Sequence, residues 1–278
     1  MKHLVVASEA IASGQLTRRR LNRDYEPLYR NVYVPKRFEP TARDRVYGAW
    51  LATGRTATML GLSAAVLHGS RWVDDDLTPE ILASHTRAPR GITAHRDRLP
   101  PDEVCTRRGI QCTTVARTAF DIGRRVEGDD AVIEVDALLN ATRVPLSAVA
   151  AMARRYPGAR GIRRLRQVIE SADEGAESKQ ESRVRLILTG AGLPRPVTQH
   201  WVGNRRLDMA WPEWKVGVEY DGAQHWNDRF QHGDDVARRE FLAERNWRMV
   251  HVVSEHLDNP GRIVARVEKA LRAAGWRP

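Results

Sequence analysis

Two short strand-like segments near the C-terminal end of the chain bring three carboxylates together. Asp208 lies in the apolar run 207–210, while Glu219 and Asp221 lie in and just after the run 216–220. Pro212 falls between the two runs, and proline favours a tight connection over the interior of a central strand. The pattern therefore predicts a β-hairpin. Because like charges that face one another across strands repel, the gathered acids indicate a bound cation.

The expected register of this hairpin places the acids on one face. Pairing residue 210 with residue 215 sets Asp208 opposite Gly217, and residues two apart on a strand point to the same side. Since glycine has no side chain, this pairing leaves room for an ion or a phosphate. The acid face comprises Asp208, Gly217, Glu219 and Asp221. The opposite, core-forming face comprises Leu207, Met209, Val216, Val218 and Tyr220.

The acids have the chemistry of a magnesium site. Mg²⁺ usually holds one or two carboxylates together with waters and substrate phosphate, which suits Asp208 and Glu219 as metal ligands, with Asp221 assisting. Such an ion, or Mn²⁺ in its place, activates a bound water for attack on a phosphodiester. His225 is the candidate general acid or base. The alternative is a solvated sheet edge that binds no metal, with His225 capping a loop.

The segment 177–253 resembles the domain of unknown function 559, a group similar to the Vsr endonucleases of the PD-(D/E)XK nuclease superfamily. The matching pieces are an opening helix with Glu181, the acid Asp208, the segment Glu219 to Gly222 with His225, a helix with Asp235, Arg238, Arg239 and Leu242, and a strand over 247–250. The resemblance implies a restriction-endonuclease-like domain in which Glu181 orients a ligand or water. The superfamily lysine is absent, because Asp221 occupies its position, so Lys215 or His225 would have to replace it. A DNA-binding remnant without cleavage is the alternative.

Helical and strand periodicity agree with that architecture. Phe241 and Leu242 recur at core positions of a helix over 235–242, which leaves Arg238 or Arg239 to contact a phosphate. The run 247–253 predicts a buried strand, and 263–271 predicts an amphipathic helix. The order helix, hairpin, helix, strand, helix is typical of an α/β sandwich.

The first forty residues carry the pattern of a winged helix-turn-helix. Residues 6–14 predict a short helix that ends at Gly14, and Thr17 is a candidate cap for a basic second helix over 18–23. The alternating run 28–34 predicts a small β-wing that stops at Pro35. In that arrangement the second helix enters a major groove. Its candidate DNA contacts are Arg18, Arg19, Arg20 and Arg23. The alternative is a solvated basic helix with no partner.

Residues 1–125 resemble AbiEi-type antitoxins of type IV toxin–antitoxin systems. The matching pieces are the segment from Gly14 to Leu21, the wing 29–33, and the segments 62–69 and 109–121. The wing has Asn31 where the family favours glycine, and asparagine tolerates the same left-handed turn. The resemblance implies a DNA-binding transcriptional repressor, with a cognate toxin protein as a further partner.

The middle of the chain predicts helices rather than explicit chemistry. Helices are expected over 44–52, over 63–68 with Ser63 as cap, and over 113–121, where Arg117 and Asp121 are four apart and able to pair. Residues 126–172 predict a helical, basic connector whose Arg163 and Arg164 are candidate phosphate contacts. A metal site that uses His68 and His95 is disfavoured, because no third ligand lies near them in sequence.

Charge and cysteine content limit the class of protein. A formal net charge of +10 favours a polyanion such as DNA as partner, although a membrane surface remains open on charge alone. There is no run of some 18 apolar residues, and the N-terminus does not have the pattern of a signal peptide. The two cysteines, Cys105 and Cys112, predict a reduced, cytoplasmic protein and disfavour a zinc site.

The sequence thus predicts an α/β chain of four parts. They are a winged helix-turn-helix module over 1–40, an α/β region over 41–125, the connector over 126–172 and an endonuclease-like domain over 173–278. Two functions fit these parts. The first is a Mg²⁺-dependent endonuclease that an N-terminal module positions on DNA. The second is an antitoxin-type transcriptional regulator whose nuclease fold is inactive.

Overall fold

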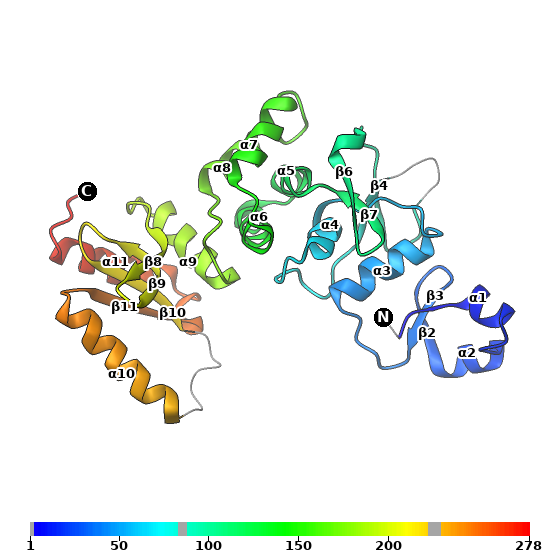
Figure 1. Ribbon diagram of the computed structural model, residues 1–278, viewed down its shortest axis with the longest axis horizontal. Helices are drawn as coiled ribbons and strands as arrows, with labels where there is room; N and C mark the ends of the chain where they lie inside the picture. Colours follow the sequence, from blue (N-terminus) through cyan, green and yellow to red (C-terminus); the bar gives the residue numbers. More distant parts are fainter. Residues whose placement is uncertain (1–2, 83–87, 222–228) are drawn as a thin grey trace. The chain divides into compact units, whose positions relative to one another are not determined.

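The computed structural model describes residues 3–82, 88–221 and 229–278, with the backbone alone for 229–236. The chain divides into two compact units, Met1–Ala172 and Asp173–Pro278. Helices and several small sheets alternate along it (Figure 1), which confirms the α/β class. Within the described part of the chain, no helix is both long enough and apolar enough to cross a bilayer.

The N-terminal module consists of two helices and a small sheet. Its elements are β1 (Val5–Val6), α1 (Ala7–Ala12), α2 (Arg18–Asp24), β2 (Tyr25–Tyr29) and β3 (Val32–Pro35), with strand order β1-β3-β2. The Thr17 hydroxyl accepts a hydrogen bond of 3.2 Å from the backbone N–H of Arg20, so the predicted cap is confirmed. Asn31 turns the β2–β3 hairpin with a φ of 63°, as expected of a left-handed residue. A small apolar core holds the helices on the sheet.

An α/β region follows the N-terminal module. It comprises α3 (Ala42–Ala52), α4 (Gly61–His68), the parallel pair β4 (Glu80–Leu82) and β5 (Thr93–His95), the hairpin of β6 (Val104–Arg107) and β7 (Ile110–Thr113), and α5 (Val115–Arg125). Ser63 is not the cap of α4, because the helix begins at Gly61. Instead its hydroxyl accepts a hydrogen bond from the Glu80 N–H at 2.8 Å and ties α4 to β4.

Residues 126–172 form part of this unit's core and not a free connector. The segment contains α6 (Gly128–Thr142), α7 (Leu146–Arg155) and α8 (Ile162–Ser171), all of which pack on α5. Leu165 and Val168 of α8 are buried. A β-carbon at Gly123 of α5 would meet a Leu165 methyl at 2.6 Å, so the two helices approach closely through that glycine. Helix α8 therefore packs on the domain through its narrow apolar stripe.

The second unit is a four-stranded sheet between helices. It comprises α9 (Lys179–Gly190), β8 (Val197–Val202), β9 (Arg205–Trp211), β10 (Val216–Asp221), α10 (Arg229–Glu244), β11 (Arg248–Val253) and α11 (Pro260–Ala273). The strand order is β11-β10-β9-β8, with β10 and β11 parallel and the other pairs antiparallel. One apolar cluster joins the sheet to α9 and α11, and a second joins it to α10. Strand β8 had no predicted counterpart in the sequence.

The β9–β10 hairpin is displaced by two residues from its predicted register. Gly217 pairs with Ala210, so the connection contains the four residues 212–215. Continuing this register sets Asp208 opposite Glu219. The prediction that Leu207 and Met209 share one face of the hairpin is also wrong. Met209 belongs to the apolar cluster that contacts α9, whereas Leu207 belongs to the cluster that contacts α10. The pairing of β8 with β9 is interrupted here, where Gln199 has a φ of 51°, so the face of β9 changes at Asp208.

Candidate functional site

Asp208 lies where strands β9 and β10 separate. Its Oδ2 accepts a hydrogen bond of 2.8 Å from the backbone N–H of Tyr220, which takes the place of a ladder bond between the strands. Burial of the side chain raises the pKa of Asp208 to about 7, and the charge of nearby Glu181 adds to the rise. The carboxyl therefore holds its proton to a higher pH than an ordinary aspartate does. A bound cation would draw off that proton.

Glu181 reaches the sheet from the first turn of α9. The Ser178 hydroxyl caps this helix by accepting a 3.1 Å hydrogen bond from the Glu181 N–H. The Glu181 carboxylate accepts a hydrogen bond of 3.0 Å from the side-chain amide of Gln199 on β8 and one of 2.9 Å from the Glu177 N–H. Burial raises its pKa as well. The charge of Glu181 contributes to the raised pKa of Asp208, so the two acids lie near each other.

Glu219 is already paired with an arginine. Arg238 on α10 donates to its Oε1, and the same guanidinium donates to the Arg206 carbonyl at 2.6 Å. Arg238 is thus engaged within the unit, and it would have to leave these partners to contact a phosphate. The physical reason is that Glu219 is only 8% exposed and a buried carboxylate needs a compensating charge. Arg239, on the same helix, is exposed.

A histidine outside the predicted site residues, His251, joins the acids. His251 on β11 is in register with Glu219 across the parallel pair β10–β11. Its Nδ1 lies 3.0 Å from Asp221 Oδ2 and 3.9 Å from Glu219 Oε2. The hydrogen bond with Asp221 raises the pKa of His251. The available sequence signal was a polar residue that interrupts the apolar run 247–253, but only the strand pairing identifies its neighbours.

These three side chains form the metal-compatible group of the second unit. One ligand atom each from Glu219, Asp221 and His251 lies within 4.8 Å of the other two. Among the described residues, that group does not include Asp208, which was an expected ligand. A mixed set of carboxylates and imidazole suits Mn²⁺ or another transition ion better than Mg²⁺, which prefers oxygen ligands alone.

Two other residues, His225 and Lys215, were expected to take part in proton transfer or to replace the motif lysine. His225 lies outside the described residues. Lys215, considered as a substitute for the motif lysine, has a φ of 50° in the hairpin turn, and its Nζ donates to the Arg245 carbonyl at 3.2 Å. It therefore binds the C-terminal end of α10 rather than the acids.

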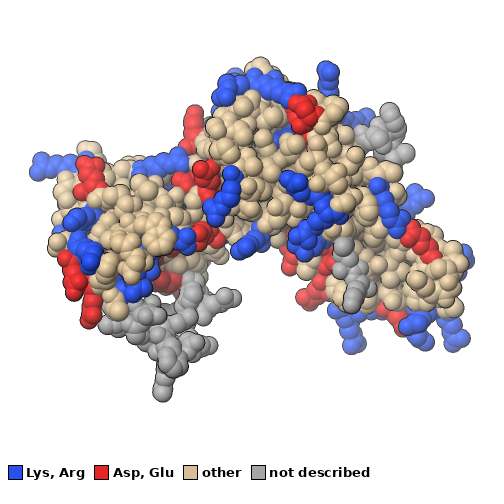
Figure 2. All heavy atoms as spheres, in the orientation of Figure 1, with Lys and Arg blue, Asp and Glu red and all other residues tan. Residues whose placement is uncertain are grey.

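The candidate DNA contacts of the first unit divide into free and engaged arginines. Arg18, Arg19, Arg20 and Arg23 are all exposed on α2. Figure 2 shows basic side chains projecting from the region of the N-terminal module. Arg23 pairs with its neighbour Asp24 at 2.7 Å and Arg20 with the same acid at 3.7 Å, but both pairs are open to solvent.

In α8, only one of the two candidate arginines is free to reach a phosphate. Arg163 is exposed. Arg164 donates to the carbonyl of Arg125 at 3.2 Å and pairs with Glu127 at the same distance, so it satisfies the end of α5. The proposal that Arg164 contacts phosphate is therefore not supported by its geometry.

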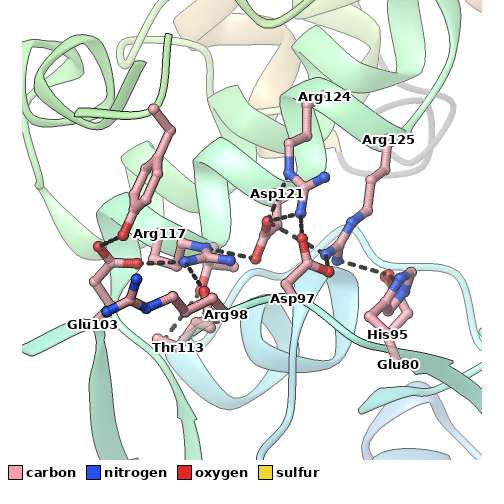
Figure 3. Close-up of polar contacts among 12 residues, drawn as sticks. Glu80, His95, Asp97, Arg98, Glu103, Thr113, Arg117, Asp121, Arg124 and Arg125 are labelled. Atoms are coloured by element: carbon pink, nitrogen blue, oxygen red, sulfur yellow. Dashed lines mark hydrogen bonds and ion pairs between the residues drawn. The ribbon is translucent and has the colours of Figure 1, made fainter. Parts of the chain in front are cut away.

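A network of ion pairs lies inside the first unit. Figure 3 shows Arg117 between Glu103 and Asp121, and Asp97 between Arg124 and Arg125. The Arg117–Asp121 contact, at 3.0 Å, confirms the pairing predicted from their spacing. These two side chains are 3% and 0% exposed, so each charge needs ionic partners, which Glu103 supplies in addition for Arg117 and Arg124 for Asp121. The network fixes α5 against η1 (Pro101–Glu103) and leaves no free charge for a ligand at Arg117.

Comparison with known proteins bears on the first unit. Residues 56–171 match the family model of the AbiEi antitoxin C-terminal domain. Two similar proteins, both described as uncharacterized, come from the CDC 1551 and H37Rv strains of Mycobacterium tuberculosis. Each is 30% identical over 172 residues, which is 60% of this chain and 64% of the relative. This chain therefore spans less than two thirds of their length. No solved structure matches it significantly.

The family match supports the predicted antitoxin resemblance and extends it toward the C-terminus. It begins at residue 56, after the N-terminal module, and continues to 171 through the helices that had been predicted as a connector. This agrees with the packing of α6, α7 and α8 on α5. The match ends before the second unit, so it carries no argument for a nuclease.

Proposed function

We propose that this protein is a DNA-binding transcriptional regulator of the antitoxin type. The observation that carries the proposal is the match of residues 56–171 to an antitoxin domain, which follows a basic module of two helices and a β-hairpin. A cognate toxin protein is part of this proposal, as the second partner beside DNA.

DNA recognition is assigned to α2 and the adjacent hairpin. The exposed arginines of α2 provide the charge that a phosphate backbone attracts, and Arg30 extends this charge to the hairpin turn. Neutralising phosphates releases counterions, so each arginine that contacts a phosphate steepens the dependence of affinity on salt. Loss of two such contacts is expected to reduce the slope of log K against log salt by roughly 2.

The test is a binding titration with DNA from upstream of the protein's own gene. The double variant Arg18→Ala, Arg19→Ala is compared with the wild-type protein by fluorescence anisotropy at several salt concentrations. Arg272→Ala, which removes an exposed arginine from α11, is the matched control. We expect weaker binding and a shallower salt dependence for the double variant only. Equal slopes for all three proteins, or no binding by the wild type, would refute the assignment.

A second candidate function is a metal-dependent endonuclease in the second unit. It is favoured by the group Glu219, Asp221 and His251, beside which Asp208 and Glu181 add two further half-buried acids. These residues would hold Mg²⁺ or Mn²⁺, which supplies an activated water and stabilises charge on a phosphodiester. Because Arg238 forms an ion pair with Glu219, that ion pair has to open before Glu219 can bind a metal.

Cleavage is tested on supercoiled plasmid with Mg²⁺ and with Mn²⁺. Nicking is expected in the wild type, and loss of nicking in Glu219→Gln and in His251→Ala. Asp258→Asn, a change at an exposed acid of the same unit, should cut normally. No nicking by the wild type, together with retained DNA binding, would eliminate the nuclease and leave the regulator.

A further inference from the structure

Two cysteines and a histidine, far apart in sequence, converge in the antitoxin-like region. Cys105 on β6 and Cys112 on β7 are directly opposite each other in the hairpin, and their Sγ atoms lie 3.7 Å apart. His68 is the last residue of α4, which Gly69 ends with a φ of 96°. The His68 Nε2 lies 4.0 Å from Cys112 Sγ. One donor atom from each residue falls within 4.8 Å of the others.

Burial disfavours the charged forms of Cys112 and His68. Both cysteines are free thiols. Burial raises the pKa of Cys112 to about 12, and burial lowers the pKa of His68. His68 Nε2 lies 2.7 Å from the Thr113 carbonyl, and Arg107 donates to its Nδ1 at 3.4 Å. A neutral imidazole is the form that binds a metal.

The separations are those of a tetrahedral zinc centre. With Zn–S distances of about 2.3 Å and Zn–N distances of about 2.0 Å, tetrahedral angles require about 3.8 Å between two sulfurs and about 3.5 Å between sulfur and nitrogen. The observed S–S separation of 3.7 Å matches the first value within about 0.1 Å, and the S–N separation of 4.0 Å would have to shorten by about 0.5 Å. A disulfide would instead need the sulfurs to approach to about 2.05 Å.

We propose that His68, Cys105 and Cys112 form a binding site for Zn²⁺ with an exchangeable fourth ligand. Two thiolates neutralise the charge of the ion, so a partly buried site carries no net charge. His68 and Cys105 are half-buried, which leaves the fourth position on the side that solvent reaches. The ion would fasten the end of α4 to the β6–β7 hairpin. This site is independent of the regulatory function and of the acidic group in the second unit.

Binding makes defined changes at the three residues. Two Zn–S bonds and one Zn–N bond form, and the two thiol protons leave to solvent. The His68 proton at Nε2 moves to Nδ1, so the contact with the Thr113 carbonyl is given up. Arg107, which is exposed, then has to swing away from Nδ1. No oxidant or other reactant is required.

Cobalt(II) provides a selective probe, because thiolate ligands give Co²⁺ an intense near-ultraviolet charge-transfer band that carboxylate and imidazole ligands cannot give. The full-length protein is titrated with Co²⁺ in the presence of a non-thiol reductant, and Zn²⁺ is then added. We expect a band that saturates at one equivalent and disappears as Zn²⁺ displaces Co²⁺. Native mass spectrometry should show one zinc retained.

Substitutions at the proposed ligands test whether the ion binds at this site. Cys105→Ser, at a half-buried position, should abolish the band while circular dichroism stays unchanged, and His68→Gln should weaken metal retention. His251→Ala in the second unit and Thr106→Ser on the exposed face of the same hairpin are matched controls that should keep the band. Absence of the band in folded, reduced wild-type protein would overturn the proposal. So would an undiminished band in Cys105→Ser, or a cysteine pair that forms a disulfide but retains no metal when reduced.

Discussion

The buried carboxyl of Asp208 makes the stability of the second unit depend on pH in an unusual direction. Its pKa is raised from 3.8 to about 7 by burial and by neighbouring acids. A rise of about three pKa units corresponds to roughly 4 kcal/mol, which is an upper bound because the side chain is only half-buried by exposed area. This is the penalty for ionising Asp208 in the folded protein relative to the unfolded chain.

The sign follows from proton binding. Because the folded pKa is the higher one, the folded state holds a proton that the unfolded chain has already lost between about pH 4 and pH 7. The stabilisation is complete below pH 4 and declines as pH rises, until it is lost above about pH 7. Asp208→Asn removes the charge yet keeps an oxygen that can accept the Tyr220 N–H. The variant should therefore be more stable than wild type at pH 8, by up to roughly 4 kcal/mol, and by up to only about 1.6 kcal/mol at pH 5, where about a third of the penalty has built up.

Urea unfolding followed by tryptophan fluorescence at pH 5 and pH 8 measures this difference. Asp258→Asn, at an exposed acid, should have no effect at either pH. If Asp208→Asn is less stable than wild type at pH 8, then Asp208 is ionised and favourably paired, and the reasoning from burial is refuted. Added Mn²⁺ should stabilise the wild type at pH 8 more than the variant if Asp208 contributes to a metal site.

Two further predictions concern packing and buried charge. Arg117→Met removes the buried cation between Glu103 and Asp121, which then keep their contacts with Arg155 and Arg124. The change should lower the free energy of unfolding of the first unit by up to about 3–5 kcal/mol; Arg55→Met, at an exposed pair, should cost less than about 1 kcal/mol. Urea titration of the two arginine variants measures both losses of unfolding free energy, and equal losses would contradict the conclusion that burial makes the Arg117 pairs more important. Gly217→Ala places a β-carbon 2.6 Å from the Met249 sulfur and should destabilise the second unit by about 1–3 kcal/mol. Gly190→Ala, whose β-carbon would have no atom within 4 Å, should not destabilise the second unit in thermal unfolding. A Gly217→Ala protein as stable as wild type would mean that Met249 moves aside at little cost.

Features that depend only on residues close together in the chain could be predicted from the sequence. The Thr17 cap, the left-handed Asn31 and the Arg117–Asp121 pair are each set within a span of four residues, so their chemistry is readable before the fold is known. The hairpin of β9 and β10 was also predictable. Its register was not, because the turn length depends on how Trp211 packs in the core rather than on Pro212 alone.

Tertiary structure decided which of these groups meet. The parallel pairing of β10 with β11 brings His251 to Glu219, and the folding of α4 onto a hairpin brings His68 to the cysteine pair. It also engages Arg238 and Arg164 in contacts that sequence could not assign. Local hydrogen bonds and helical spacing are properties of adjacent residues, whereas these encounters result from long-range packing, in which burial selects one arrangement out of many that the same local pattern permits.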